Sequence, residues 1–203
     1  MQRTKAKTAK GIVRNSKGAA RHERILSDLM AALADGSLRN PSLREIGQAL
    51  EIEPAHILYY FPSREALLQA VINRWDMDSR SFVGKADSGL PITLDDFVAA
   101  IAHNITQPGI VHLYLTLAAE AINPGHAAHG FFRERFAIGC NMLADAIRRE
   151  QADGSIAPDQ DPDLHARFLI ALADGLQLQS LVDPDVDAAG DLGDAVSLLR
   201  RLR

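Results

Sequence analysis

Apolar side chains recur three or four residues apart along most of the chain. The set Ile25, Leu29 and Leu33 is typical, and no stretch shows the sustained alternation of apolar and polar residues expected of strands. The pattern therefore predicts an all-α protein. The expected helices cover residues 21–34, 43–50, 54–61, 64–78, 94–105, 110–122, 131–151, 162–182 and 189–202.

Turn-forming residues divide these helices into two domains. Ser, Gly and Pro are frequent in residues 79–92, which predicts a connector. It separates a three-helix, helix-turn-helix domain at 18–78 from a larger helical domain at 93–203. Residues 1–17 lack an apolar face and are expected to form a disordered basic arm. The helix at 110–122 is apolar almost all round, so we expect it to be central and buried.

The segment before residue 64 has the local signals of a helix-turn-helix. Ser42 and Glu45 have the spacing of a capping box at a helix start. Pro54 suits the first turn of the next helix, because proline has no amide hydrogen to satisfy. Ser63 is placed to cap a third helix. Two short helices joined by a tight break, followed by a capped helix, are typical of DNA-binding domains whose second short helix enters the major groove.

The helix at 54–61 has an unusual outward face. Ile57 and Phe61 are spaced to face the core, which leaves the outward positions listed next. These are Ala55, His56, Leu58, Tyr59 and Tyr60. Exposed aromatic side chains suit a DNA groove, and Arg64 could hold a phosphate at the start of the following helix. A small helical core with scattered surface aromatics remains the alternative.

Charge is unevenly distributed along the chain. The formal net charge is −4, yet residues 1–80 carry 13 Lys and Arg against 9 Asp and Glu. Up to Arg24 there are eight basic residues against Glu23 alone. Such a basic arm indicates a polyanionic partner or, alternatively, a solubilising tail.

Composition narrows the class of protein further. At 47% hydrophobic the chain can bury a large core, and its apolar runs are too short to cross a membrane. The basic N-terminus lacks the apolar stretch of a secretory signal. The single cysteine, Cys140, excludes an intrachain disulfide, which fits a cytoplasmic location.

Residues 42–72 resemble the DNA-binding signature of the TetR family of transcriptional regulators. The most specific part is Tyr-Phe-Pro-Ser-Arg-Glu-Ala-Leu-Leu at 60–68, and the resemblance extends over about residues 21–75. It implies a homodimer that binds double-stranded operator DNA. It also implies the following contacts: Ser42 and Arg44 with the DNA backbone, Ala55, His56 and Tyr59 with base edges, and Tyr60 and Arg64 with phosphates.

Three residues depart from the family pattern. Glu51 stands where the family usually has Gly, and Glu53 where it has Ser or Thr. A left-handed turn at Glu51 would cost about 1–2 kcal/mol, and both carboxylates would weaken DNA binding. Leu58 replaces a Tyr that usually contacts phosphate.

The resemblance also implies that the C-terminal domain binds a small-molecule effector and dimerises through its last two helices. We expect a repressor that an apolar organic effector releases from DNA, with a transcriptional activator as the alternative. The candidate pocket residues are His112, Tyr114, Glu120, Phe132, Phe136 and Cys140.

Other chemistry finds little support in the sequence. His126, His129 and Glu120 are near one another, but structural or catalytic zinc needs stronger evidence of three or four ligands. We therefore expect no metal and no cofactor. The chain has neither a Gly-x-Ser-x-Gly elbow nor a phosphate-binding loop, so we do not expect an enzyme. A helical enzyme that has lost DNA binding, or a module that binds protein, remains a rival interpretation.

Overall fold

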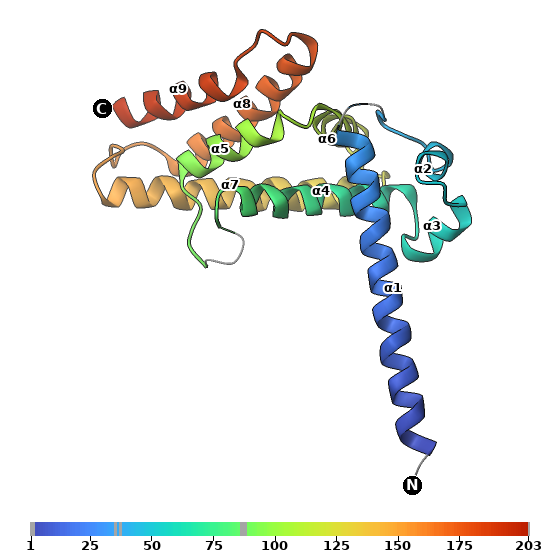
Figure 1. Ribbon diagram of the computed structural model, residues 1–203. Helices are drawn as coiled ribbons and strands as arrows, with labels where there is room; N and C mark the ends of the chain where they lie inside the picture. Colours follow the sequence, from blue (N-terminus) through green and yellow to red (C-terminus); the bar gives the residue numbers. More distant parts are fainter. Residues whose placement is uncertain (1–2, 35, 37, 86–88, 203) are drawn as a thin grey trace.

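The computed structural model describes residues 3–34, 36, 38–85 and 89–202, with side chains from residue 18 onward. All regular secondary structure in these residues is α-helical, which confirms the predicted fold class (Figure 1). The helices are α1 (Arg3–Ala34), α2 (Leu43–Ala49), α3 (Pro54–Tyr60), α4 (Arg64–Phe82), α5 (Leu94–Asn104), α6 (Pro108–Glu120), α7 (His129–Ala152), α8 (Pro162–Val182) and α9 (Ala188–Arg201).

The first helix is longer than the apolar pattern predicts. We expected helix from about residue 21 and disorder over 1–17, but α1 begins at Arg3, and only residues 1–2 lie outside the described part here. Residues 3–20 contain no proline and are rich in Ala, Lys and Arg. These residues favour helix without any apolar face, and the packed part of α1 supplies the nucleus from which the helix extends. The N-terminal half of α1 projects beyond the body of the molecule (Figure 1).

The helix-turn-helix signals are confirmed in detail. The Ser42 hydroxyl accepts a hydrogen bond from the Glu45 amide at 3.3 Å, and the Ser42 amide donates to the Glu45 carboxylate at 2.7 Å. Pro54 occupies the first turn of α3, and Ser63 caps α4. Glu51 has a φ of 53°, so the left-handed turn that usually takes glycine is present here with a glutamate.

Two apolar clusters form the interior of the described residues. The first joins α1, α2 and α3 to the first half of α4 and to α6, with Ile25, Ile57 and Leu68 among its fully buried members. The second joins α5, α7, α8 and α9, with Leu143 and Leu192 at its centre. The predicted burial of the helix now seen as α6 is confirmed, because Leu113 and Leu117 are inaccessible to solvent.

Helix α4 belongs to both parts of the molecule. It runs to Phe82, about a turn beyond the end expected at residue 78, and so takes over the start of the expected connector at 79–92. The reason lies in packing: Ser79 is buried, and its hydroxyl lies 2.9 Å from the carbonyl oxygen of Trp75 one turn earlier. Helix α4 therefore extends from the helix-turn-helix into the C-terminal region (Figure 1).

The end of α1 crosses the start of α6 at very short range. A Cβ atom placed on Gly109 would lie 1.8 Å from the carbonyl oxygen of Leu33 and 2.9 Å from its carbonyl carbon. No residue other than glycine fits there without separating the two helices, so α1 and α6 are in direct backbone contact.

Candidate nucleic-acid interface and ligand cavity

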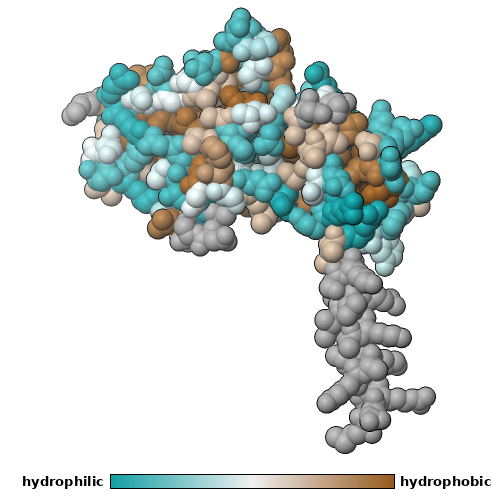
Figure 2. Space-filling model, in the orientation of Figure 1, coloured by the Kyte–Doolittle hydropathy of each residue, from teal (hydrophilic) through white to brown (hydrophobic). Residues whose placement is uncertain are grey.

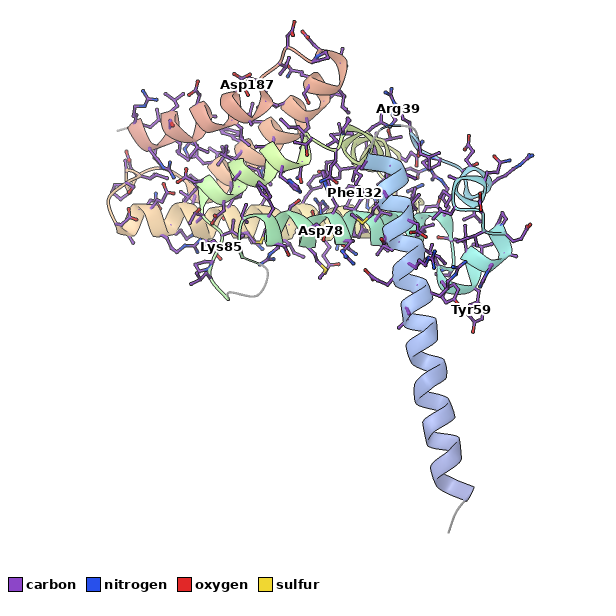
Figure 3. The ribbon with its side chains drawn as sticks, viewed as in Figure 1. Arg39, Tyr59, Asp78, Lys85, Phe132 and Asp187 are labelled. Carbon is purple, nitrogen blue, oxygen red and sulfur yellow. The ribbon has the colours of Figure 1, made fainter. Side chains whose placement is uncertain are left out.

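The outer face of α3 presents its side chains to solvent as predicted. Ile57 is completely buried, whereas Tyr59 on the opposite face is 78% exposed. Figure 3 shows Tyr59 pointing away from the body of the molecule at its helix-turn-helix end. Ala55 and His56 are also exposed. The face therefore offers a protruding phenol beside small and polar neighbours.

Tyr60 supports this face from the side. Its ring centroid lies 5.0 Å from that of Tyr59 in an edge-to-face arrangement and 5.6 Å from that of His56. The residue is half-buried and packs against the first apolar cluster. These contacts limit the rotamers open to Tyr59 and His56, which keeps the outward face in a defined shape.

Arg64 is placed differently from a free phosphate ligand. Its Nε donates to the carbonyl oxygen of Pro41 at 2.7 Å, and its guanidinium also donates to the Asn40 side chain. The same group lies 3.3 Å from Glu65 and 3.9 Å from Glu120. Only 19% of the side chain is exposed. Arg64 thus ties the start of α4 to the α1–α2 connection and to the end of α6.

Positive charge is scarce on the compact part of the helix-turn-helix. Residues 18–78 carry six arginines against nine Asp and Glu. Exposed Glu51 and Glu53 lie just before α3. Arg44, exposed on α2, is one of the few free cations near the outward face. Residues 3–17, by contrast, contain six Lys and Arg and no acidic residue, so attraction of a polyanion depends on this part of α1.

A cavity of about 470 Å³ lies between the two apolar clusters. This volume is in the range that suits a drug-sized ligand. Helices α4, α5, α6, α7 and α8 all contribute to it. Its apolar lining includes Trp75, Phe97, Ile101, Phe131, Phe136, Met142, Leu143 and Ile170. Its polar lining includes Asp76, Ser79, Asn104, Tyr114, Arg135, Asp174 and Gln177.

Charged side chains that line this cavity form hydrogen bonds with other side chains in its wall. Arg135 on α7 holds Asp76 on α4 through two hydrogen bonds, of which the Nη2–Oδ1 bond is 2.8 Å long. The guanidinium also lies 5.1 Å from the centre of the Tyr114 ring, and the Tyr114 hydroxyl donates to Asp174 at 2.9 Å. These contacts bring α4, α6, α7 and α8 together around one hollow.

The surroundings shift the protonation of these groups. Burial raises the pKa of Asp174, and this effect outweighs the opposing hydrogen bond from Tyr114 and the charge of Arg135. Burial and the neighbouring Asp174 carboxylate raise the pKa of the Tyr114 hydroxyl. Burial alone would lower the pKa of Arg135, but the bonded Asp76 carboxylate raises it overall.

Comparison with known proteins identifies the chain. A family model described as BetI-type transcriptional repressor, C-terminal, matches residues 94–201. A second, described as bacterial regulatory proteins, tetR family, matches residues 25–71. The chain belongs to the TetR family. It is a DNA-binding transcriptional regulator, and regulators of the TetR family are in general not enzymes.

Solved structures of other proteins share the fold. A TetR-family regulator from Rhodococcus sp. is 23% identical, with a TM-score of 0.71 over 89% of this chain and 99% of that one. Salmonella enterica GusR is 23% identical, with a TM-score of 0.63 over 88% and 95%. SmeT, the repressor of the Stenotrophomonas maltophilia multidrug efflux pump SmeDEF, is 18% identical, with a TM-score of 0.61 over 88% and 87%. No curated protein matches the sequence significantly.

The TetR-family fold separates the residues that we proposed for the effector pocket. Tyr114 and Phe136 line the cavity. Phe132 lies behind them, 3% exposed, with its ring 5.7 Å from that of Tyr114. His112 and Glu120 point elsewhere, as described next, and half-buried Cys140 is not among the lining residues.

His112 and Glu120 lie on the side of α6 that faces the DNA-binding domain. His112 borders a small separate hollow beside Gly109 and Arg39. Glu120 accepts a hydrogen bond from Asn40 at 3.1 Å. Because this helix is apolar almost all round, its residue pattern does not indicate which of its two sides faces the cavity. In the described residues, moreover, no cluster of three His, Cys, Asp or Glu side chains could hold a metal ion.

The main residues that the sequence analysis missed are Asp76, Arg135, Asp174 and Gln177. Asp174 and Gln177 interrupt the otherwise apolar stretch of α8. Polar groups at positions that should be buried are a signal of function, and they would have marked this helix as part of the pocket.

No helix in the described part of the chain is both long and apolar enough to cross a bilayer.

Proposed function

We propose that the chain is a repressor that binds its operator as a homodimer and leaves it when a small molecule occupies the cavity. The continuity of α4 carries this proposal. Leu67 and Leu68, in the first half of α4, pack in the core beneath the helix-turn-helix, whereas Asp76 and Ser79 line the cavity. One rigid element thus has one end in each functional region.

A ligand would act through this shared helix. Contacts with Asp76 or Ser79 that differ between the empty and the occupied cavity would change the tilt of α4. Ser63 and Phe61 join the other end of α4 directly to α3. A change of tilt would therefore move α3, and in a dimer it would alter the spacing of the two reading helices. The match to a BetI-type repressor model over residues 94–201 supports repression.

The proposed DNA contacts follow the exposed positions. Ala55, His56 and Tyr59 enter the major groove. Ser42 and Arg44 contact the backbone from the start of α2, and Tyr60 contacts a phosphate at the edge of the groove. For Arg64 we now propose a positioning role, because its hydrogen bonds to Pro41 and Asn40 hold the helix-turn-helix against α6.

Apolar side chains on the outer faces of α8 and α9 support a homodimer. They include Phe168 at 56%, Leu178 at 53%, Val182 at 80% and Leu198 at 59% exposure. Figure 2 shows apolar atoms at the surface over this end of the molecule. Burying such a surface against a second copy would be favourable. Leu176, by contrast, is 5% exposed and belongs to the subunit's own core.

Fluorescence anisotropy with labelled duplex from the chain's own upstream region tests the proposal. We expect saturable binding at physiological salt that an unrelated duplex of equal length does not compete away. Removal of the gene should raise expression from that region, and a fall would instead indicate an activator. Sedimentation of Phe168→Asp should show monomers, whereas Met77→Asp, an exposed position on α4, should leave the dimer intact.

A further inference from the structure

Two buried polar atoms in the cavity wall have no hydrogen-bond partner among the described residues. They are the indole Nε1 of Trp75, a residue 1% exposed, and the Oε1 of Gln177, a residue 2% exposed. Buried polar groups in native proteins are nearly always satisfied, so each unpaired one requires an explanation. Both residues line the cavity, and a ligand there could satisfy both atoms once the side chains that cover them shift.

The two atoms have opposite hydrogen-bonding character. An indole N–H can only donate. The orientation of the Gln177 amide is fixed, because its Nε2 donates to the carbonyl oxygen of Ala173 at 3.1 Å and that oxygen can only accept. The remaining Oε1 of Gln177 is therefore an acceptor. The wall offers one donor and one acceptor.

Neighbouring polar groups in the wall already have partners. Ser79, one turn beyond Trp75 on α4, lies 2.6 Å from the Asn104 side chain. Asp174, nearly one turn before Gln177 on α8, accepts from Tyr114. The ring of Tyr114 in turn lies 6.0 Å from that of Trp75. The unpaired donor on α4 and the unpaired acceptor on α8 thus each lie within about one helical turn of a polar group that already has a partner.

Charge in the cavity argues against an anionic ligand, and hydrogen bonding argues against an ammonium ion. The positive charge of Arg135 is matched by Asp76, while Asp174 has only a hydroxyl as its direct partner. A carboxylate ligand would meet this excess of acid and would give Gln177 no donor. An ammonium ligand could bind Gln177 but would leave the Trp75 N–H unpaired.

We propose that the effector is a neutral amphipathic molecule whose head group both accepts a hydrogen bond from Trp75 and donates one to Gln177. A carboxamide or an alcohol has this chemistry. An aromatic or aliphatic body would lie against Phe97, Phe131 and Phe136 in the rest of the cavity. This inference rests on the proposed role of the cavity as the effector site.

Trp75 also supplies the assay, because it is the only tryptophan in the chain. Its emission can be followed during titration with four probes that share one body: 4-phenylbutanamide, 4-phenylbutanoate, 4-phenylbutylamine and butylbenzene. We expect the amide to bind at least about tenfold more tightly than each of the other three, the equivalent of 1.4 kcal/mol, and to shift the emission. Equal affinities, tighter binding of either ion, or no binding of the amide at millimolar concentration would overturn the proposal.

Variants locate the head group. Gln177→Met and Trp75→Phe should each reduce amide affinity about tenfold in calorimetric titrations and leave butylbenzene affinity unchanged. His112→Phe is the matched control, because His112 Nδ1 is also buried and unpaired but borders the other hollow. Amide affinity should be unchanged there. If Trp75→Phe fails to fold in a thermal melt, Gln177→Met alone decides, and unchanged amide affinity in that variant would refute the assignment.

The outcome is separable from that of the proposed function. Operator release is measured by anisotropy, and probe binding by tryptophan emission in the absence of DNA. Tight, head-group-specific binding without operator release would refute effector control but not the chemistry of the site. Operator binding without any preference for the amide would refute only the chemistry.

Discussion

The helix-turn-helix places its polar side chains on the outside of the fold, whereas the C-terminal region places polar side chains around an internal cavity. Around α3 the interior is filled by apolar side chains such as Ile57, while Tyr59 stands outside in solvent. In the C-terminal region a cavity lies beside the second apolar cluster, and charged groups such as Arg135 and Asp76 face that cavity. Helix α4 takes part in both arrangements.

We propose that this difference follows from the size of the partner that each region binds. A rigid outward face can meet a large polyanion, and its polar groups stay hydrated until binding. Recognition of a small molecule requires enclosure, so polar groups must be buried beforehand and held by hydrogen bonds among themselves. The shape of the helix-turn-helix accordingly depends on a filled apolar core. The shape of the cavity depends on hydrogen bonds among the polar side chains that line it.

The largest expected effect concerns the outward region. Deletion of residues 1–17 removes six cations from a DNA-binding region whose compact part, 18–78, carries more acid than base. If all six neutralise phosphates, the slope of log affinity against log salt becomes shallower by about 5. Anisotropy at 50–200 mM salt measures this on operator and random duplexes. The preference for the operator should survive, and its loss would show that the arm reads sequence.

The next effect tests whether the outward region depends on its filled core. Leu68→Ala removes a completely buried side chain and should lower the free energy of unfolding by about 2–5 kcal/mol in urea titrations. Leu58→Ala, on the outer face of α3 and 42% exposed, is the matched control, and it should cost less than about 1 kcal/mol. Equal losses would mean that the outer face is packed after all.

A smaller effect separates base contacts from phosphate contacts. Tyr59→Ala should cost about 1–3 kcal/mol of binding free energy on the operator and little on random DNA. Arg44→Ala should weaken both equally and reduce the salt slope by about 1. The ratio of specific to nonspecific affinity distinguishes the two. A ratio unchanged in Tyr59→Ala would remove that residue from sequence recognition.

The smallest effect concerns the polar network of the cavity. Burial raises the pKa of Asp174, so the native state takes up a proton at a higher pH than the unfolded chain does. Stability should therefore rise as the pH falls from the raised pKa towards the ordinary aspartate value of about 4. Asp174→Asn keeps an acceptor for Tyr114 and should abolish this increase. Urea titrations at several pH values will show it, and an unchanged profile would assign the increase to other groups.

How far the sequence predicts each region depends on the range of the interactions involved. The cap at Ser42 and the first-turn Pro54 follow from residues a few positions apart, and the structure confirms both. The left-handed turn at Glu51 was indicated by the family resemblance alone, and it is present. The cavity depends on contacts such as Tyr114 with Asp174, 60 positions apart, which no local pattern encodes. His112 and Glu120, which we expected in the pocket, therefore lie outside the lining of this cavity.

Long-range contact explains the later end of α4, whereas the earlier start of α1 follows from helix propensity without an apolar face. Helix α1 begins at Arg3 and α4 ends at Phe82, so both helices are longer than the local apolar pattern predicts. In α4 the buried Ser79 makes contact with Asn104 of α5, a partner 25 positions away. For Arg64 the resemblance indicated a phosphate contact, whereas in the folded chain Pro41 and Asn40 accept two of its five N–H donors.

The crossing of α1 and α6 at Gly109 has a consequence for the design of biosensors. Since any Cβ there would collide with the Leu33 backbone, mutation cannot adjust this junction gradually. Cavity positions such as Met142 and Ile138, on another helix and each partly exposed, are free of that constraint. Libraries aimed at new inducers should therefore vary the cavity positions and keep position 109 fixed. Ligand preference can then change while the contact between α6 and the DNA-binding domain is kept.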